Sequence, residues 1–393
     1  TGQSIDDAKR QWMYARDPKE PCFGQNKRIL AYFAVDLYNA AMATNIDRDK
    51  TMFLPFNQGS NGAGNDGGAG NPQTNDGDYV TSYLWKEVWQ KDKLLDIIQK
   101  FINVQKEEKK TKGADGNQRM ETKMRVIFPR YHQLDVVRKL VAHVRDNGAG
   151  HNYLIQHSAG SGKSNSIAWT AYRMASLHDA DNEPVFTSVI IVTDRRVLDQ
   201  QLQATISSFD HTLGTVVTID EKKSSWDLRN AINDGKRIIV STLQKFPVIY
   251  DQLNETAGKR FAVIVDEAHS SQTGKSALKL KEGLADMSDA LKEYAEIEEA
   301  AQEEIDNKDI LVQEMLSQGR HKNLSFFAFT ATPKGKTLEI FGEPYPDGSF
   351  HPFHIYSMKQ AIEEGFILDV LANYVTYKMC YQIASNTPEN PDV

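Results

Sequence analysis

Five short hydrophobic runs recur along the chain from about residue 124 onward, each separated from the next by stretches with helical spacing. They are rich in β-branched and aromatic residues, which is typical of strands that are buried on both faces. Strands that alternate with helices predict a parallel sheet with helices on both of its faces, the α/β class. The runs are Tyr153–Gln156, Ser188–Val192, Arg237–Ser241, Phe261–Val265 and Leu324–Phe329.

The first hundred residues follow a different pattern and are expected to form a separate unit. Arg28–Ala43 alternates apolar and aromatic residues, which predicts strands of a mixed sheet. The segment 57–78 contains seven glycines and is expected to be a surface loop. Apolar residues at helical spacing between Leu94 and Ile102 predict an amphipathic helix.

Changes in composition suggest where domains begin and end. Residues 1–110 would form the first unit, and the lysine-rich, glycine-punctuated segment 111–123 would be a linker. Residues 124–350 would form the α/β lobe, with the acidic, helix-favouring segment 275–318 inserted between two of its strands. Residues 351–393 would begin a second lobe.

The overall charge and the cysteine content exclude few functions. The 46 basic and 53 acidic residues give a net charge of −7, which does not point to a nucleic-acid binder, although a local basic groove would suffice for one. Two cysteines far apart in the sequence fit a reducing cytoplasm and offer neither a disulfide framework nor a zinc site. No apolar run approaches the roughly 18 residues that a membrane-spanning helix needs, so we expect a cytoplasmic protein without a membrane anchor.

A phosphate-binding sequence follows the first hydrophobic run and precedes a helical stretch, 166–177, which is the context that such a loop requires. Glycines let backbone N–H groups approach phosphates, and the helix N-terminus favours anions. Lys163 is expected to reach the β- and γ-phosphates of ATP, and Ser164 to bind Mg²⁺. His157 stands where the full pattern has a glycine. The expected nucleotide-binding residues of the loop are Gly160, Ser161, Gly162, Lys163 and Ser164.

Two adjacent carboxylates follow the hydrophobic run 261–265. Asp266 would hold the Mg²⁺ ion, and Glu267 would activate the attacking water. An isolated Asp-Glu pair at a strand end is usually surface charge, but its order after the phosphate-binding loop favours the catalytic interpretation. The sequence continues with Ala268 and His269.

Three further groups of residues are candidates with open alternatives. Gln133, about thirty residues before the loop, could pair with the adenine edge, or it could simply start a helix. Arginines and hydroxyl groups at two strand ends could contact DNA phosphates, or they could be solvated surface groups. A Thr-Ala-Thr-Pro turn follows the last hydrophobic run. The residues of these two latter groups are Arg195, Arg196, Thr242, Thr330 and Thr332.

These motifs, in this order, resemble those of superfamily 2 helicases. The chain as a whole resembles the restriction (motor) subunit of type I restriction–modification enzymes. The resemblance implies a RecA-like motor lobe preceded by the remainder of an α/β nuclease domain. It also implies ATP and Mg²⁺ as cofactors, and His269, Thr330 and Thr332 as links between nucleotide and DNA. The segments that carry it are 157–164, 192–196, 240–245, 266–272 and 329–334.

The resemblance further implies ATP-driven translocation of double-stranded DNA, remote cleavage, and methylation and specificity subunits as partners. The nuclease residues would precede Thr1. The arginines that complete the ATP site would follow Val393, because no arginine occurs after Arg320, so this stretch is expected to bind ATP but to hydrolyse it poorly. Two alternatives remain: another superfamily 2 DNA motor, such as a type III restriction subunit or a remodelling ATPase, and a nucleotide-dependent assembly scaffold that does not hydrolyse ATP.

Overall fold

The computed structural model describes residues 3–23, 28–74, 77–112, 118–193, 202, 205–207, 215–219, 223–242, 258–266 and 322–368. The candidate residues Arg195, Arg196, Glu267 and His269 lie outside the described residues, as does the proposed insert 275–318. The side chain of Thr242 is also outside them, although its backbone is described.

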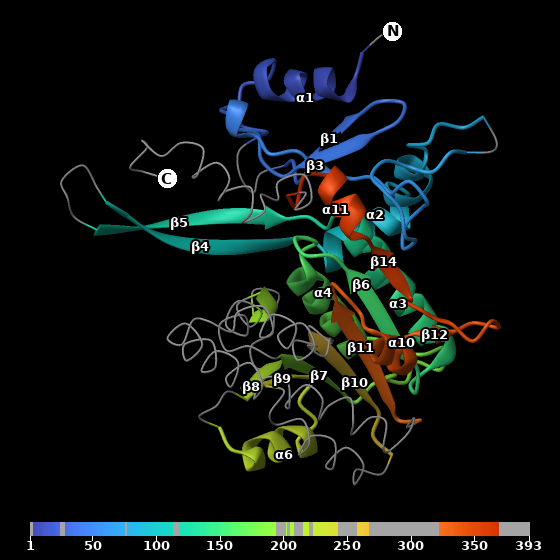
Figure 1. Cartoon of the computed structure of the whole chain (residues 1–393). Coiled ribbons are helices and arrows are strands. Elements are labelled where there is room, and N and C mark those ends of the chain that lie inside the picture. Colours follow the sequence, from blue (N-terminus) through green and yellow to red (C-terminus); the bar gives the residue numbers. More distant parts are fainter. Residues whose placement is uncertain are drawn as a thin grey trace, which may run out of the picture.

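A seven-stranded parallel sheet forms the centre of the larger lobe (Figure 1). Its strand order is β14-β6-β11-β10-β7-β9-β8, and every neighbouring pair is parallel. All residues of β7 and β11 are buried, as their unbroken hydrophobic runs predict. The strands are β6 (Asn152–His157), β7 (Ser188–Thr193), β8 (Val216–Ile219), β9 (Ile238–Thr242), β10 (Phe261–Asp266), β11 (Leu324–Thr330) and β14 (His354–Tyr356).

All five hydrophobic runs are strands of this sheet, which confirms the predicted α/β fold of the larger lobe. The sequence analysis did not identify β8 or β14, which lie at the two edges. Strand β14 pairs with β6, so residues 354–356 complete the first sheet. The expected start of a second lobe at residue 351 is therefore wrong for these residues, and any second lobe would begin later in the chain.

Helices cover both faces of the sheet because successive strand residues face opposite sides. Ile264 belongs to one hydrophobic cluster, together with residues of α3 and α4, and Val263 belongs to a second cluster with residues of α6 and α10. This alternation gives the sheet a separate apolar layer on each face. The helices of the lobe are α3 (Tyr131–Asn147), α4 (Lys163–Ala175), α6 (Ser225–Asn233), α10 (Gly335–Phe341) and α11 (Met358–Glu363), and a small hairpin of β12 (Glu343–Pro344) and β13 (Phe350–His351) follows α10.

The N-terminal unit contains a three-stranded sheet in the order β1-β2-β3. Both of its pairings are antiparallel, so the expectation of a mixed sheet was wrong. Helix α2 confirms the helix predicted between residues 94 and 102. The elements are α1 (Ile5–Tyr14), β1 (Tyr32–Val35), β2 (Ala40–Ala43), η1 (Arg48–Lys50), β3 (Leu54–Pro55), η2 (Leu84–Val88) and α2 (Lys91–Lys100).

The N-terminal unit and the larger lobe share one of the two hydrophobic clusters. The Phe101 ring lies 5.7 Å from the Trp169 ring of α4, and the Trp169 indole N–H donates to the Phe101 carbonyl at 2.9 Å. The Phe56 ring lies 5.7 Å from the Tyr131 ring of α3. The two units are therefore packed together through aromatic side chains.

Two strands, β4 (Asn103–Lys112) and β5 (Gln118–Ile127), form an antiparallel ribbon that extends away from the body (Figure 1). The sequence analysis expected a linker at 111–123, because these residues are charged and poor in apolar side chains. The described residues of that segment instead continue the ladder, with Lys112 opposite Gln118. Backbone hydrogen bonds form a ribbon here without an apolar face.

None of the described helices has the length and apolarity needed to cross a membrane.

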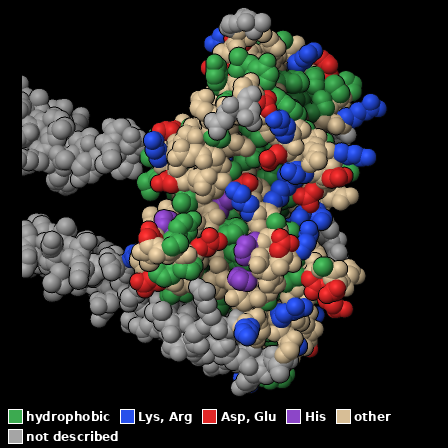
Figure 2. Space-filling view, turned by 90° about the vertical axis from the view of Figure 1, so that its right-hand side faces the viewer, with side chains coloured by type: hydrophobic (Ala, Val, Ile, Leu, Met, Phe, Trp, Pro, Cys, Tyr) green, Lys and Arg blue, Asp and Glu red, His purple; other side chains and the backbone are tan. Residues whose placement is uncertain are grey.

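The surface differs between the two units. In Figure 2, hydrophobic side chains gather in the upper part of the molecule, at the height of the N-terminal unit in Figure 1. Large side chains of that unit are exposed, among them Leu37, Tyr38 and Met52. Acidic, basic and histidine side chains are interspersed below them.

Replacement of Phe327 by alanine is expected to lower the free energy of unfolding by about 3–5 kcal/mol, the usual effect of deleting a buried phenylalanine. Phe327 is fully buried in β11 and stacks on Tyr153 at 4.8 Å between ring centroids. Chemical denaturation measures the change. Trp226→Ala is the control, because Trp226 is 68% exposed and its loss should change stability by less than about 0.5 kcal/mol. Equal effects of the two substitutions would contradict the central position of β11.

Candidate nucleotide-binding site

The predicted motifs meet at the carboxyl edge of the parallel sheet, which is where such sheets bind ligands. The phosphate-binding loop follows β6, Thr330 ends β11, and Asp266 ends β10. Because β11 lies between β6 and β10, Asp266 is two strands away from the start of the loop, or about 10 Å at the usual strand spacing. Thr193 and Thr242 end β7 and β9 at the same edge and are paired in register.

Two glycines in the left-handed region shape the loop. Gly160 has φ +69° and Gly162 has φ +75°, and helix α4 begins directly afterwards at Lys163. Gly162 is the N-cap of α4 and supplies no side-chain cap, and the N-terminus of a helix favours an anion. A Cβ on Gly162 would lie 2.6 Å from Nε2 of Gln133, so side chains larger than hydrogen do not fit here.

Gln133 supports the loop by hydrogen bonds to its backbone carbonyl groups. Its Nε2 donates to the carbonyls of Ser161, at 3.1 Å, and Gly162, at 3.0 Å, and its Oε1 accepts from the backbone N–H of Arg130 at 2.9 Å. Both amide hydrogens are thereby used within the protein. The bidentate adenine contact expected from the sequence needs one of those hydrogens, so it is not available in this arrangement.

Two neighbours of Gln133 bind the same loop. The Arg130 guanidinium donates to the Gly160 carbonyl at 3.0 Å, and Nε2 of His132 lies 3.0 Å from the Ser161 carbonyl. The His132 ring stacks on Tyr356 of β14 at 3.9 Å between centroids. The start of α3 therefore holds three consecutive carbonyl groups of the loop.

Buried hydroxyl groups in the loop fit a phosphate ligand. Ser158 and Ser161 are each 1% exposed, and neither Oγ has a hydrogen-bond partner in the described part of the chain. Buried polar groups in proteins are normally hydrogen-bonded, so these hydroxyls mark a place where a polar ligand would complete the site. Together with the uncapped helix start, they suit a phosphate chain.

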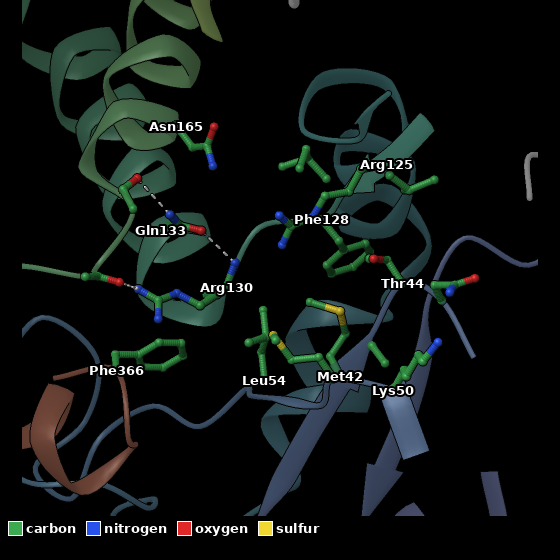
Figure 3. A pocket seen from close by; sticks show the side chains of 17 residues that line it. Met42, Thr44, Lys50, Leu54, Arg125, Phe128, Arg130, Gln133, Asn165 and Phe366 are labelled. Carbon is green, nitrogen blue, oxygen red and sulfur yellow. Dashed lines mark hydrogen bonds between the residues drawn. The ribbon is translucent and has the colours of Figure 1, made fainter. Parts of the chain in front are cut away.

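A pocket of about 500 Å³ lies beside the loop, between the N-terminal sheet and the motor lobe (Figure 3). The loop contributes Gly160 and Gly162 to its lining, and Arg130 stacks on the Phe366 ring at 3.9 Å. The opposite wall comes from β2, β3 and the end of β5. The labelled side chains of the lining are Met42, Thr44, Lys50, Leu54, Arg125, Phe128, Arg130, Gln133, Asn165 and Phe366.

Three histidines are buried behind the loop. Burial lowers the pKa of His132, His157 and His354, and the neighbouring positive charge of Arg130 adds to this effect at His132. All three rings are therefore neutral near pH 7. Burial also raises the pKa of Glu364, which accepts a hydrogen bond from Tyr356 at 2.7 Å.

The structure brings together some of the predicted residues and not others. The loop 160–164, Gln133, Asp266 and Thr330 lie at one edge of the sheet, and the Thr332 backbone N–H donates to Oγ1 of Thr330 at 3.3 Å. Thr330 is buried and Thr332 is exposed. Arg130, His132 and Phe366 also belong to the site, although the sequence motifs do not include them. Proximity to Gln133 in the sequence could have indicated the first two, whereas no sequence signal connects Phe366 with the loop.

Comparison with known protein families gives one match. The SWI2/SNF2 ATPase family matches residues 132–386, a range that includes α3 except its first residue, the phosphate-binding loop and the described strands of the larger sheet. No curated protein matches the sequence.

Similar solved structures include helicases and a restriction subunit, all at low similarity. A fragment assigned as an HsdR subunit of a type I restriction enzyme from Vibrio vulnificus YJ016 has a TM-score of 0.33 at 16% identity. The Hef helicase domain from Pyrococcus furiosus has 0.32 at 15%, and a hypothetical ATP-dependent RNA helicase from Sulfolobus tokodaii has 0.30 at 16%. The matches cover 60%, 53% and 53% of this chain, but only 32%, 36% and 47% of the respective structures.

Acid is expected to destabilise the protein through the buried histidines. Their folded-state pKa values lie below the value near 6.5 of the unfolded chain, so the unfolded state binds more protons below that pH, and stability is lost as the pH falls through it. Each ring contributes up to about 1.4 kcal/mol per pH unit. Urea unfolding between pH 8 and 5 measures the trend.

A histidine-to-glutamine pair isolates this effect, because the raised pKa of Glu364 favours the folded state toward lower pH and opposes the trend. His132→Gln should make the loss of stability with falling pH less steep, by up to the uptake of one proton, and His351→Gln, at an exposed position, is the control. A His132→Gln variant with the same pH dependence as the unsubstituted protein would contradict the neutral state of that ring.

Proposed function

Because the chain belongs to the SWI2/SNF2 ATPase family, we propose that it binds ATP with Mg²⁺ at the loop 157–164 and uses hydrolysis to move along double-stranded DNA. One observation carries this proposal. The buried strand β6 leads into a loop with two glycines in the left-handed region, and helix α4, which has no side-chain cap, follows the loop. Strand β10 ends in the carboxylate of Asp266 at the same edge of the sheet. This arrangement presents backbone N–H groups to a phosphate chain.

Each polar residue of the site has a proposed role. Lys163, at the first position of α4, would contact the β- and γ-phosphates. Ser164 and Asp266 would hold Mg²⁺, which neutralises charge on the phosphates when it is bound. Glu267, the residue after the end of β10, would accept a proton from the attacking water. Ser161 and the glycines 160 and 162 would surround the phosphates.

The nucleotide base is proposed to occupy the pocket between the N-terminal sheet and the loop. The pocket adjoins the loop at Gly160 and Gly162, so a base attached to bound phosphates could reach it. Apolar side chains such as Met42 and Phe128 line it, as is usual for sites that bind aromatic ligands. In this proposal Gln133 acts by supporting the loop rather than by reading adenine.

The finer proposal is the restriction (motor) subunit of a type I restriction–modification enzyme, acting with methylation and specificity subunits and cleaving DNA at a distance. The order of the motifs from His157 to Pro333 and the N-terminal α/β unit packed against the lobe support it. Arg195, Arg196 and Thr242 would contact DNA phosphates. His269, with Thr330 and Thr332, would transmit the nucleotide state to the DNA.

The match to the SWI2/SNF2 ATPase family favours one alternative, a DNA motor of the remodelling type without a nuclease. DNA cleavage separates the two candidates. The full-length protein, combined with its methylation and specificity subunits, ATP and Mg²⁺, should cut double-stranded DNA if it is a restriction subunit. ATP-dependent movement on DNA without any cleavage would favour the alternative. Neither movement nor DNA-stimulated hydrolysis would favour an assembly scaffold.

Two substitutions test the proposed ATP site. Lys163→Ala should abolish ATP-driven translocation by the full-length protein, because phosphate binding is lost, while DNA binding persists. Glu267→Gln should retain ATP binding but lower the hydrolysis rate at least 100-fold, the usual contribution of a general base. A translocation assay, steady-state hydrolysis, ATP titration and a DNA-binding assay measure the four properties. Lys236→Ala, at an exposed lysine between α6 and β9, is the control. Unchanged hydrolysis by Glu267→Gln would show that another group is the base.

Competition between ATP and GTP tests the supporting role of Gln133. Gln133→Ala removes three buried hydrogen bonds, each worth about 1 kcal/mol, and should weaken the binding of both nucleotides by a similar factor of at least ten. A residue that reads adenine would instead lose affinity for ATP alone. Gln90→Ala, at an exposed glutamine, controls for loss of an amide. A selective loss of ATP binding would restore the adenine-reading role.

A further inference from the structure

His157, the first residue of the phosphate-binding loop, is connected by hydrogen bonds to two other side chains. It is fully buried, and its Nε2 lies 2.9 Å from Nδ1 of His354 on β14. The Nε2 atom of His354 lies 3.0 Å from a carboxylate oxygen of Asp135 on α3. The Lys139 ammonium lies 2.7 Å from the same carboxylate oxygen. A relay therefore runs from α3 through β14 to the start of the loop, and it consists of Asp135, His354 and His157.

The chemistry of the three groups fixes the position of each proton. A carboxylate can only accept, so His354 donates to Asp135 from Nε2. A neutral His354 ring then accepts at Nδ1, and the donor is Nε2–H of His157. The relay thus orients both rings, and a residue at 354 that cannot accept would leave the buried His157 donor without its partner.

The glycine-rich loop of the N-terminal unit, residues 57–74, lies directly against His354. Gly64, with φ +85°, pairs with Ile355, whose backbone N–H donates to the Gly64 carbonyl at 2.8 Å. A Cβ on Gly64 would lie 2.8 Å from Cδ2 of the His354 ring. The Lys139 ammonium donates to the Ala63 carbonyl at 2.8 Å. The segment is a loop, as the sequence predicts, and it packs against β14 and α3.

Further contacts attach the same loop to the start and end of α11. The Ala69 backbone N–H donates to the Glu363 carboxylate at 2.6 Å, and the Ser357 hydroxyl donates to the Gly67 carbonyl at 2.5 Å. A Cβ on Gly68 would lie 2.3 Å from the Glu363 carboxylate. These hydrogen bonds attach the loop to α11, which directly follows β14.

We propose that His354 is a positioning residue for nucleotide binding, which holds His157 and is itself held by the glycine-rich loop. This inference rests on the proposed ATP site. It makes the nucleotide affinity of the motor lobe depend on the N-terminal unit, through a contact at a residue that touches no nucleotide. A change in the glycine-rich loop that displaces His354 changes the orientation of His157 and hence the shape of the phosphate-binding loop.

Two glycines of the same loop provide a matched test. Gly64 and Gly62 have φ values of +85° and +84°, so alanine strains the backbone equally at both positions. Only at Gly64 does the added methyl group meet His354, since at Gly62 it would meet Asn65 at an ordinary 3.6 Å. Gly64→Ala should raise the Kd for ATP with Mg²⁺ at least five-fold relative to Gly62→Ala, at a similar melting temperature. Titration and thermal unfolding of the same samples measure the two quantities.

Substitutions of His354 separate its two hydrogen bonds. Asparagine places an amide oxygen near the position of Nδ1 and can still accept from His157, whereas glutamine places its amide near Nε2 and can reach only Asp135. His354→Gln loses the buried hydrogen bond from His157 and should raise the Kd for ATP about ten-fold. His354→Asn keeps that hydrogen bond, so its Kd for ATP should remain within about two-fold of the value for the unsubstituted chain. His351→Asn, at an exposed histidine of β13, is the control.

The outcomes distinguish this inference from the proposed function. Absence of ATP binding by the unsubstituted protein would overturn the ATP site itself. If the unsubstituted protein binds ATP, equal affinities for Gly64→Ala and Gly62→Ala would overturn the positioning role. Should Gly64→Ala fail to fold, the His354 pair decides, and equal affinities of the asparagine and glutamine variants would overturn the role as well. A purely structural His354 would lower the melting temperature of both variants without separating their affinities.

Discussion

The phosphate-binding loop must leave its N–H groups open to an anion while its carbonyl groups remain satisfied inside the protein. Every backbone carbonyl that is buried without a partner costs free energy, so the reverse side of the loop needs donors. Arg130, His132 and Gln133 supply them to three consecutive carbonyls. One helix start thus fixes the direction in which the peptide groups of the loop point. The rest of the site depends on this fixed direction.

The donors themselves are held by structure outside the loop. His132 stacks on Tyr356, Arg130 stacks on Phe366, and both aromatic residues lie near the end of the described chain. The glycine-rich loop covers β14 from the other side. Segments from the beginning, the middle and the end of the described chain therefore meet behind one loop. The N-terminal unit and the lobe also pack together through the hydrophobic cluster that they share.

The sequence predicted the central sheet because its strands are buried on both faces and leave unbroken apolar runs. It also predicted the motif positions, since parallel strands bring their carboxyl ends to one edge. Strand β14 was not predicted because it has only three residues, His354–Tyr356, and one of them is a histidine, so it does not form an apolar run. The ribbon of β4 and β5 was mistaken for a linker because its strands lack an apolar face. The packing of the glycine-rich loop depends on close contacts with distant residues, and composition does not encode such partners.

The place of β6 in the sheet has a consequence for the synthesis of the protein. Its two neighbours, β11 and β14, follow much later in the chain, with Tyr153 paired to Phe327 and Ile155 paired to His354. The first of these separations is 327 − 153 = 174 residues. At a translation rate of about 5–20 residues per second, both edges of the strand that leads into the nucleotide site stay unpaired for roughly 10–35 s. Unpaired strand edges are templates for aggregation, so among the described strands of the larger sheet β6 waits longest for a partner during synthesis.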